Sequence, residues 1–362
     1  GASGFNLVGT NIVFSSAPTG GHSFFGIIYA TADYLNAGGT FPAGSTGSPS
    51  ITFTTDTDTG LYRKGSGDIG FVSNAVEIVN IDGNGLTVTS KDATINSVSI
   101  GKGANSVAGN TRLGINALDA SVSGGDNTAI GHSSLTSLTS GTNNVGVGVE
   151  SLGQNTTASN NTAIGKHALR INTTGDSNTA IGSNALDANT TGVSLVAVGY
   201  GALGANTTAD QNVAVGQNAL GTNTTGGTCV AVGHDALLSN TSGSNNSALG
   251  ANALDACTTG NNNVAIGQSA LSSNTTASDN VAVGQGALND NTTGTANTAI
   301  GRIALGENTT ASNNTAVGFS AVNANTTGTN NTGLGYNSLG ANTTGSSNTA
   351  VGVNALDANS TG

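Results

Sequence analysis

The sequence NTAIGKHALRINTTGDS, residues 161–177, decides the fold of this 362-residue chain because variants of it recur every 17 residues. Its glycine follows an aliphatic residue, and fifteen such pairs occur without insertion or deletion. A strict period of this kind predicts a solenoid, in which each repeat is one geometrically equivalent rung. We number the positions of each rung from this glycine, position 0. The fifteen glycines are Gly114, Gly131, Gly148, Gly165, Gly182, Gly199, Gly216, Gly233, Gly250, Gly267, Gly284, Gly301, Gly318, Gly335 and Gly352.

A short β-branched segment precedes each of these glycines. Position −1 is Ile, Val or Leu throughout, position −3 is Val or Thr in fourteen rungs, and position −2 is Ala or Gly in all but the first, which has Arg112. This alternation predicts a strand over positions −3 to −1. We expect positions −1 and −3 to face the core, together with the Leu at position +4 of a second short strand. The small residues at −2 would then face outward, where a neighbouring chain can approach closely.

Asparagine recurs at two positions, −4 in thirteen rungs and +7 in twelve. Stacked amides predict hydrogen-bonded ladders along the solenoid axis, but asparagine also suits tight corners, and the sequence leaves both explanations open. The corner sequence Asn-Thr-Thr-Gly, residues 172–175, is expected to use its Asn and Gly for positive φ angles.

Composition excludes several classes of protein. The chain has 56 Gly, no Trp or Met, and only 7% charged residues, which argues against helices. A net charge of −11 with eight Lys and Arg argues against nucleic-acid binding. The longest apolar stretch, around residues 24–29, is too short to cross a bilayer. The chain begins with Gly1, which is typical of a processed or partial chain.

No pattern of residues predicts catalysis, a cofactor or a metal site. The segments 56–60 and 82–85 lack the later glutamate of a calcium loop, so we expect turns there. No histidine has a cysteine or a carboxylate near it at the spacing that a metal site requires. They are His22, His132, His167 and His234. The sequence therefore predicts a protein that is not an enzyme.

The two cysteines replace ladder asparagines in different columns, where a column is the set of residues at one position in successive rungs. Cys229 stands at position −4 and Cys257 at +7. We expect the two columns to lie on different edges of the coil, beyond the distance that a disulfide spans. Both thiols are therefore predicted to be free.

Two regions before the repeats resemble parts of known fibres. The motif NSVSIGKGA, residues 96–104, resembles the head repeat of trimeric autotransporter adhesins, which implies a parallel β-roll. The segments 49–53, 58–63, 70–72 and 81–86 resemble the shaft of bacteriophage tail fibres that carry an endosialidase-type C-terminal chaperone. In such fibres a β-roll often follows, and the chaperone trimerises the chain before cleaving itself off.

These patterns predict three regions in an all-β chain. Residues 1–48 form a β-rich attachment or junction region, with an expected strand at 11–14 and an aromatic cluster at 24–29. Residues 49–94 form a tail-fibre-like β shaft, and residues 95–362 form a parallel β-solenoid, or β-roll, of fifteen 17-residue rungs. The small core expected per rung favours a parallel homotrimer.

The resemblance implies a structural and adhesive fibre of a phage virion. Such a rod would join other tail proteins through its N-terminal region and present a surface to a host glycan or protein, without inserting in a membrane. One alternative is a bacterial cell-surface adhesin or self-assembling extracellular filament. Another is an ice-binding solenoid, because Thr at +8 and +9 forms ranks along one side.

Position +1 is the most variable column, which predicts exposure. Three of its residues are aromatic and are candidate receptor contacts: Tyr200, Phe319 and Tyr336. The last two stand on adjacent rungs, so we expect their rings to stack.

Overall fold

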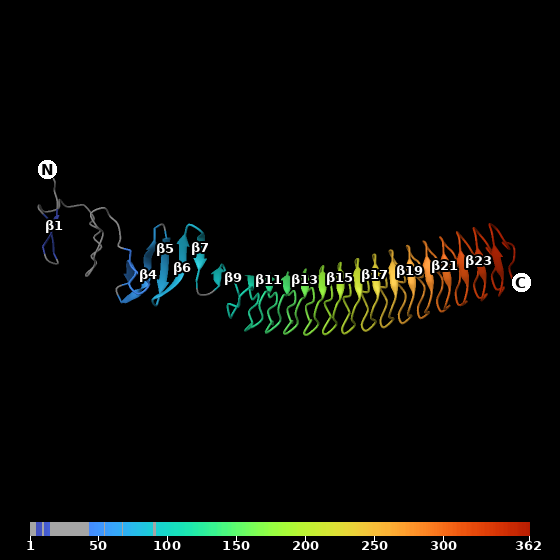
Figure 1. Cartoon of the computed structure of the whole chain (residues 1–362), viewed down its shortest axis with the longest axis horizontal. Helices are drawn as coiled ribbons and strands as arrows, with labels where there is room; N and C mark the ends of the chain where they lie inside the picture. Colours follow the sequence, from blue (N-terminus) through green and yellow to red (C-terminus); the bar gives the residue numbers. More distant parts are fainter. Residues whose placement is uncertain (1–4, 9–10, 15–42, 54, 67, 90–91) are drawn as a thin grey trace, which may run out of the picture. The chain divides into compact units, whose positions relative to one another are not determined.

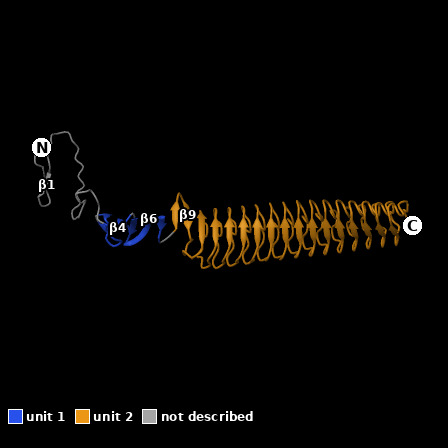
Figure 2. Cartoon of the chain, turned by 45° about the horizontal axis from the view of Figure 1, so that its top comes forward, with its two compact units in different colours: residues 1–90 blue, residues 91–362 orange. Residues whose placement is uncertain are grey.

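The computed structural model describes residues 5–8, 11–14, 43–53, 55–66, 68–89 and 92–362. The chain divides into two compact units, residues 1–90 and residues 91–362 (Figure 2). Within the described residues there is no helix, as the composition predicts. Strands β1 (Phe5–Val8) and β2 (Asn11–Phe14) pair antiparallel, which confirms the expected strand at 11–14. The aromatic cluster at 24–29 lies outside the described residues.

The other described strands of the first unit form an antiparallel meander of five strands in chain order. They are β3 (Ile51–Phe53), β4 (Asp56–Gly65), β5 (Asp68–Ser73), β6 (Val76–Asp82) and β7 (Gly85–Val88). The expected turn at 82–85 is confirmed, with the Asn84 amide donating to the Asp82 carboxylate at 2.7 Å. The turn expected at 56–60 is wrong, because these residues belong to strand β4.

One face of the meander exposes mostly polar and the other mostly apolar side chains, although the register also places Arg63 beside Ile69 on the apolar face. On the polar face the buried Tyr62 hydroxyl donates to Glu77, which also pairs with Lys64 at 3.0 Å. On the apolar face the register aligns Leu61 with Phe71, and Ile69 with Ile81. The described residues of this unit place no second layer over that face, and Phe53 on the adjoining strand is 65% exposed.

The second unit is a parallel β-solenoid of about fourteen turns, with one strand per 17-residue rung (Figure 1). Every strand pairs in register with the strand 17 residues later, for example Ala163 with Ala180. The strands are β10 (Thr111–Gly114), β11 (Thr128–Ile130), β12 (Val145–Val147), β13 (Thr162–Ile164), β14 (Thr179–Ile181), β15 (Val196–Val198), β16 (Val213–Val215), β17 (Val230–Val232), β18 (Ser247–Leu249), β19 (Val264–Ile266), β20 (Val281–Val283), β21 (Thr298–Ile300), β22 (Thr315–Val317), β23 (Thr332–Leu334) and β24 (Thr349–Val351).

The strands face the opposite way from the sequence prediction. Position −2 is the buried one, as at Ala163 and Ala214, whereas positions −1 and −3 point outward. A Cβ built at Gly146, a −2 position, would lie 2.5 Å from the Ser134 hydroxyl and 3.1 Å from that of Ser151, both at +3. The two walls of the coil thus approach across small side chains, and a larger aliphatic residue at −2 has no room. One large aliphatic, at +4, fills the interior of most rungs, and Leu138 and Leu195, which stand in the two asparagine columns, are buried as well.

The second strand that we expected after each glycine is absent from the described rungs. Positions +2 and +4 have left-handed φ angles instead, near 61° at His167 and 50° at Leu169, so the chain runs through consecutive turns. These turns still bond from rung to rung. The His167 amide donates to the Val149 carbonyl at 2.9 Å, and the Leu169 amide donates to the Ala185 carbonyl at 3.0 Å. The backbone ladder therefore continues through both walls.

The asparagine ladders are confirmed. In the −4 column the Asn161 amide N–H donates to Asn144 Oδ1 at 3.0 Å. In the +7 column Asn189 Nδ2 donates to Asn172 Oδ1 at 2.8 Å. Both columns are buried, so their amides need the partners that the ladder supplies.

The corner uses different residues from those we expected for its positive φ angle. Neither Asn172 nor Gly175 has a positive φ, and that conformation belongs to position −5, as at Ser177 with φ near 60°. Asn172 instead closes the corner through its side chain, since Nδ2 donates to the Gly175 carbonyl at 2.9 Å. The prediction of positive φ at the Asn and Gly of this corner is wrong.

An antiparallel segment covers the first strand of the solenoid. Strand β8 (Ala93–Ile95) pairs with β9 (Val98–Gly101), which pairs antiparallel with β10. Residues 96–104, whose motif implied a parallel rung, therefore form a hairpin and its continuation. The buried Arg112 replaces the core alanine here, and its Nε lies 2.7 Å from the Asp92 carboxylate. The ion pair closes this end of the interior.

The two cysteines are free, as predicted, but their placement on different edges is wrong. The −4 and +7 columns meet at one carbonyl, because Asn161 and Asn172 both donate to the Gly175 oxygen, at 3.0 and 2.9 Å. Cys229 and Cys257 therefore occupy neighbouring columns on adjacent rungs. Burial raises the pKa of the Cys257 thiol to about 11, so it stays protonated at neutral pH.

Cys257 interrupts its ladder. Asn240 Nδ2 donates to Asn223 Oδ1 at 2.7 Å, but Asn240 Oδ1 is buried without a partner. On the next rung, Cys257 lacks the amide that elsewhere donates to this oxygen. We expect Cys257→Asn to raise the free energy of unfolding by about 1–2 kcal/mol, because it satisfies a buried acceptor. Urea denaturation measures the gain. Cys257→Ala is the control, and equal stability of the two variants would contradict this explanation.

Candidate functional site

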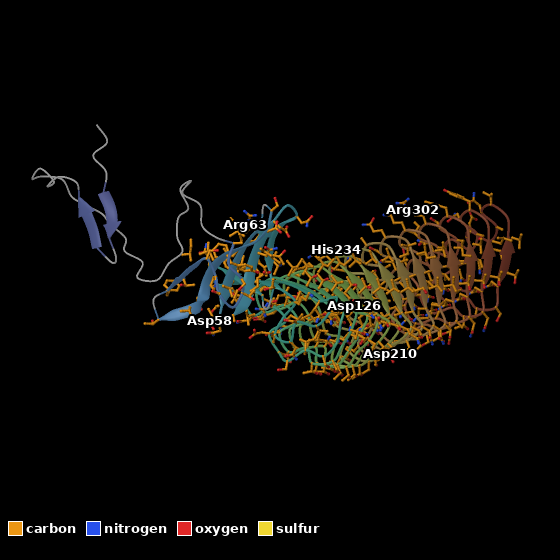
Figure 3. The ribbon with its side chains drawn as sticks, turned by 60° about the vertical axis from the view of Figure 1, so that its left-hand side comes forward. Asp58, Arg63, Asp126, Asp210, His234 and Arg302 are labelled. Atoms are coloured by element: carbon orange, nitrogen blue, oxygen red, sulfur yellow. The ribbon has the colours of Figure 1, made fainter. Side chains whose placement is uncertain are left out.

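The +1 column lies on the outside of the solenoid, as its variability predicts. Figure 3 shows two of its members, His234 and Arg302, along the same edge of the roll. The three candidate contact residues are exposed, Tyr200 by 57%, Phe319 by 39% and Tyr336 by 53%. All three rings are therefore accessible on the surface of one chain.

Phe319 and Tyr336 form a stacked pair, as we expected. Their ring centroids are 5.5 Å apart, and the ring planes differ by 8°. Arg302, one rung earlier, places its guanidinium 5.5 Å from the centre of the Phe319 ring. Three consecutive rungs thus build a cation–π and stacking ladder, which stabilises the surface whether or not a ligand binds.

Tyr200 lies apart from this pair, seven rungs earlier, and borders a surface groove of about 430 Å³. The floor includes Gly201 and Gly204 from its own rung and Gly221 from the next. Position +5 carries glycine on these two consecutive rungs, whereas the flanking rungs carry Asp187 and Leu238. The missing side chains create the depression.

Sequence reasoning missed a continuous aliphatic face on the outside of the parallel sheet. Its residues are the Ile, Val and Leu at −1, flanked by the Thr and Val at −3; Ile164 is 40% exposed and Leu249 is 50% exposed. Because the strands pair in register, these side chains form straight rows along fifteen rungs. The sequence does contain an indication of this face. The residues at −2 are small enough for the narrow interior, which leaves the aliphatic residues at −1 and −3 on the outside.

Of the threonines considered for ice binding, those at position +8 are engaged in the fold, whereas those at +9, such as Thr174, are exposed. At position +8 the hydroxyl donates to the carbonyl of the next rung, for example from Thr173 to Thr190 at 3.0 Å and from Thr190 to Thr207 at 3.0 Å. These hydroxyl protons hold the rungs together.

The described residues contain no group of His, Cys, Asp and Glu that would hold a metal ion. His167 pairs with Glu150 at 3.5 Å, and His234 with Asp235 at 3.2 Å. No helix in the described part of the chain is long and apolar enough to span a bilayer.

Comparisons with protein-family models, with curated proteins and with solved structures returned no match.

Proposed function

We propose that this chain is a structural and adhesive fibre of a phage virion, in which three copies form a parallel rod that presents a host-binding surface. The observation that carries the proposal is the continuous aliphatic face of the solenoid sheet. A continuous exposed apolar surface is typical of a protein interface.

Two further features support self-association. The meander of residues 51–88 is a single-layer sheet with an apolar face, and such sheets need a second layer to be stable. The solenoid interior holds one large aliphatic in most rungs and two in a few, so each turn gains little from its own core. A neighbouring copy supplies the same in-register rows, and parallel packing matches them over the whole length.

The rod would adhere to a host because its repeated rungs present many weak binding sites. Rung-to-rung hydrogen bonds hold the outward side chains rigidly, and three copies triple the number of weak sites on each fibre. The resemblance of residues 49–94 to tail-fibre shafts favours a virion, with the N-terminal region joining other tail proteins. The alternative is a bacterial adhesin or extracellular filament, which would use the same rod and the same faces.

Immunogold electron microscopy distinguishes the two. Antibodies raised against the purified chain are applied to virus particles made by the genome that carries the gene, and to the uninfected bacteria. We expect label on the particles, at their tail or another external fibre. Label on the surface of uninfected cells would support the adhesin and overturn the proposal.

A further inference from the structure

The groove beside Tyr200 has the chemistry of a saccharide site. We propose that it binds one or two rings of a neutral sugar, with the apolar face of one ring stacked on Tyr200. This inference deepens the proposed adhesive function by naming the class of receptor. The groove has a volume of about 430 Å³ and is open to solvent along its length.

The glycines make the space. Gly204 and Gly221 are the two glycines that stand at +5 on consecutive rungs, and the rungs on either side of them carry Asp187 and Leu238 in this column. Successive rungs advance by about 4.8 Å, so two glycines open a gap of about 10 Å along the axis. Gly201 on the same rung removes a further side chain next to Tyr200. One face of the Tyr200 ring is thereby left open to a flat partner.

The polar groups around this space suit sugar hydroxyls. The Asn184 side-chain amide makes no hydrogen bond within the described part of the chain, so it has both donors and an acceptor to offer. Asn218 donates to Asp235 at 3.1 Å, which fixes its amide and leaves its oxygen to accept. Amides of this kind pair with adjacent hydroxyls that both donate and accept.

The charged side chains around the groove argue against an anionic ligand. The groove is lined by one charged side chain, Asp187, whose carboxylate accepts from Arg170 at 2.8 and 3.3 Å. No lysine or arginine lines the groove to meet a sialate, sulfate or phosphate. The backbone around it is also rigid, because the amide of Ala205 donates to the Gly221 carbonyl at 3.1 Å. The site is therefore preformed and requires little ordering on binding.

None of the residues that line the groove belongs to the −1 or −3 columns. The groove lies on the wall that follows the glycine bend, whereas the aliphatic face is formed by the strands. Sugar binding and self-association therefore use different surfaces and are tested separately.

Saturation-transfer NMR on the purified full chain tests the proposal. The probes are lactose, maltose and di-N-acetylchitobiose, each at about 10 mM, since a shallow site has a millimolar Kd. We expect signal from at least one of them and a weaker signal from sialyllactose. Tyr200→Ala should raise the Kd by about tenfold, and the double variant Gly204→Asn, Gly221→Asn should abolish binding by filling the groove.

The matched control is Gly306→Asn with Gly340→Asn, which adds the same side chains at +5 of distant rungs, where Asn289 and Asn323 already occur in the column. This control should bind as the unchanged chain does. Absence of signal from all three neutral sugars, or binding that survives the filled groove, would overturn the proposal. Because the assay uses neither cells nor virions, its failure leaves the proposed fibre function to its own test.

Discussion

Gly148→Ala is expected to destabilise the solenoid by about 3–4 kcal/mol. Gly148 has a φ of 135°, which residues with a Cβ rarely adopt. A Cβ built on it would lie 2.5 Å from the carbonyl oxygen and 2.7 Å from the carbonyl carbon of Gly165 on the next rung. Both atoms belong to backbone that is held by rung-to-rung hydrogen bonds, so neither is free to move aside. The free energy of unfolding from urea titration measures the loss.

Gly153→Ala on the same rung is the control. Its φ is not in the left-handed region, and its nearest neighbour beyond the adjoining residues is the Glu150 carbonyl, 3.1 Å from the built Cβ. Side chains already occupy the same column on other rungs, as at Arg170. We expect this change to cost less than about 1 kcal/mol. Similar losses from the two substitutions would contradict this explanation, because the loss at Gly148 would then not depend on its φ angle or on its contact with the next rung.

The period and the strands were predictable because they depend only on spacing. Fifteen aliphatic–glycine pairs without an insertion require equivalent rungs, and the structure places a strand immediately before each of these glycines. The asparagine columns were predictable for the same reason. Their ladder, as between Asn172 and Asn189, needs only that successive rungs stack in register.

Which face of each strand is buried was not predictable from the alternation alone. Alternation shows that positions −1 and −3 share a face, but it does not show which face is inside. The usual rule places aliphatics inside, and here the interior is too narrow, since Ala163 at −2 and Ala168 at +3 are both fully buried. The left-handed φ angle of Leu169 was not predictable either. Residue propensities disfavour that conformation, and only the closed coil imposes it.

The candidate contact residues were identified from the variability of one column, and the groove was not. Tyr200 stood out as a scarce aromatic, but the space beside it depends on the coincidence of glycines at +2 and +5 on neighbouring rungs. That coincidence is visible in the sequence only after each position has been assigned an inward or outward direction. The structure supplies those directions.

Three lysines on the apolar faces are expected to convert the proposed trimer into monomers. The variant carries Phe71→Lys on the meander, and Ile181→Lys and Val215→Lys at position −1 of the solenoid. All three side chains point outward and are 36–39% exposed in the single chain, so the substitutions spare the core. In a trimer they would bury unpaired charges, each at a cost of several kcal/mol. Light scattering should give about 105 kDa for three unchanged chains of 34.9 kDa and about 35 kDa for the variant.

The control carries the same added charge on surfaces that the proposed trimer leaves open. It combines Thr87→Lys, on the polar face of the meander, with Ser183→Lys and Gln217→Lys at position +1. Position +1 already holds Lys166, so the fold tolerates the change. We expect this control to remain a trimer and to unfold at the same temperature as the unchanged chain. A monomeric mass for the unchanged protein would contradict assembly through the aliphatic rows. A trimeric mass for the apolar-face variant would contradict it as well, because lysines buried between the three chains would have no partners to neutralise their charge.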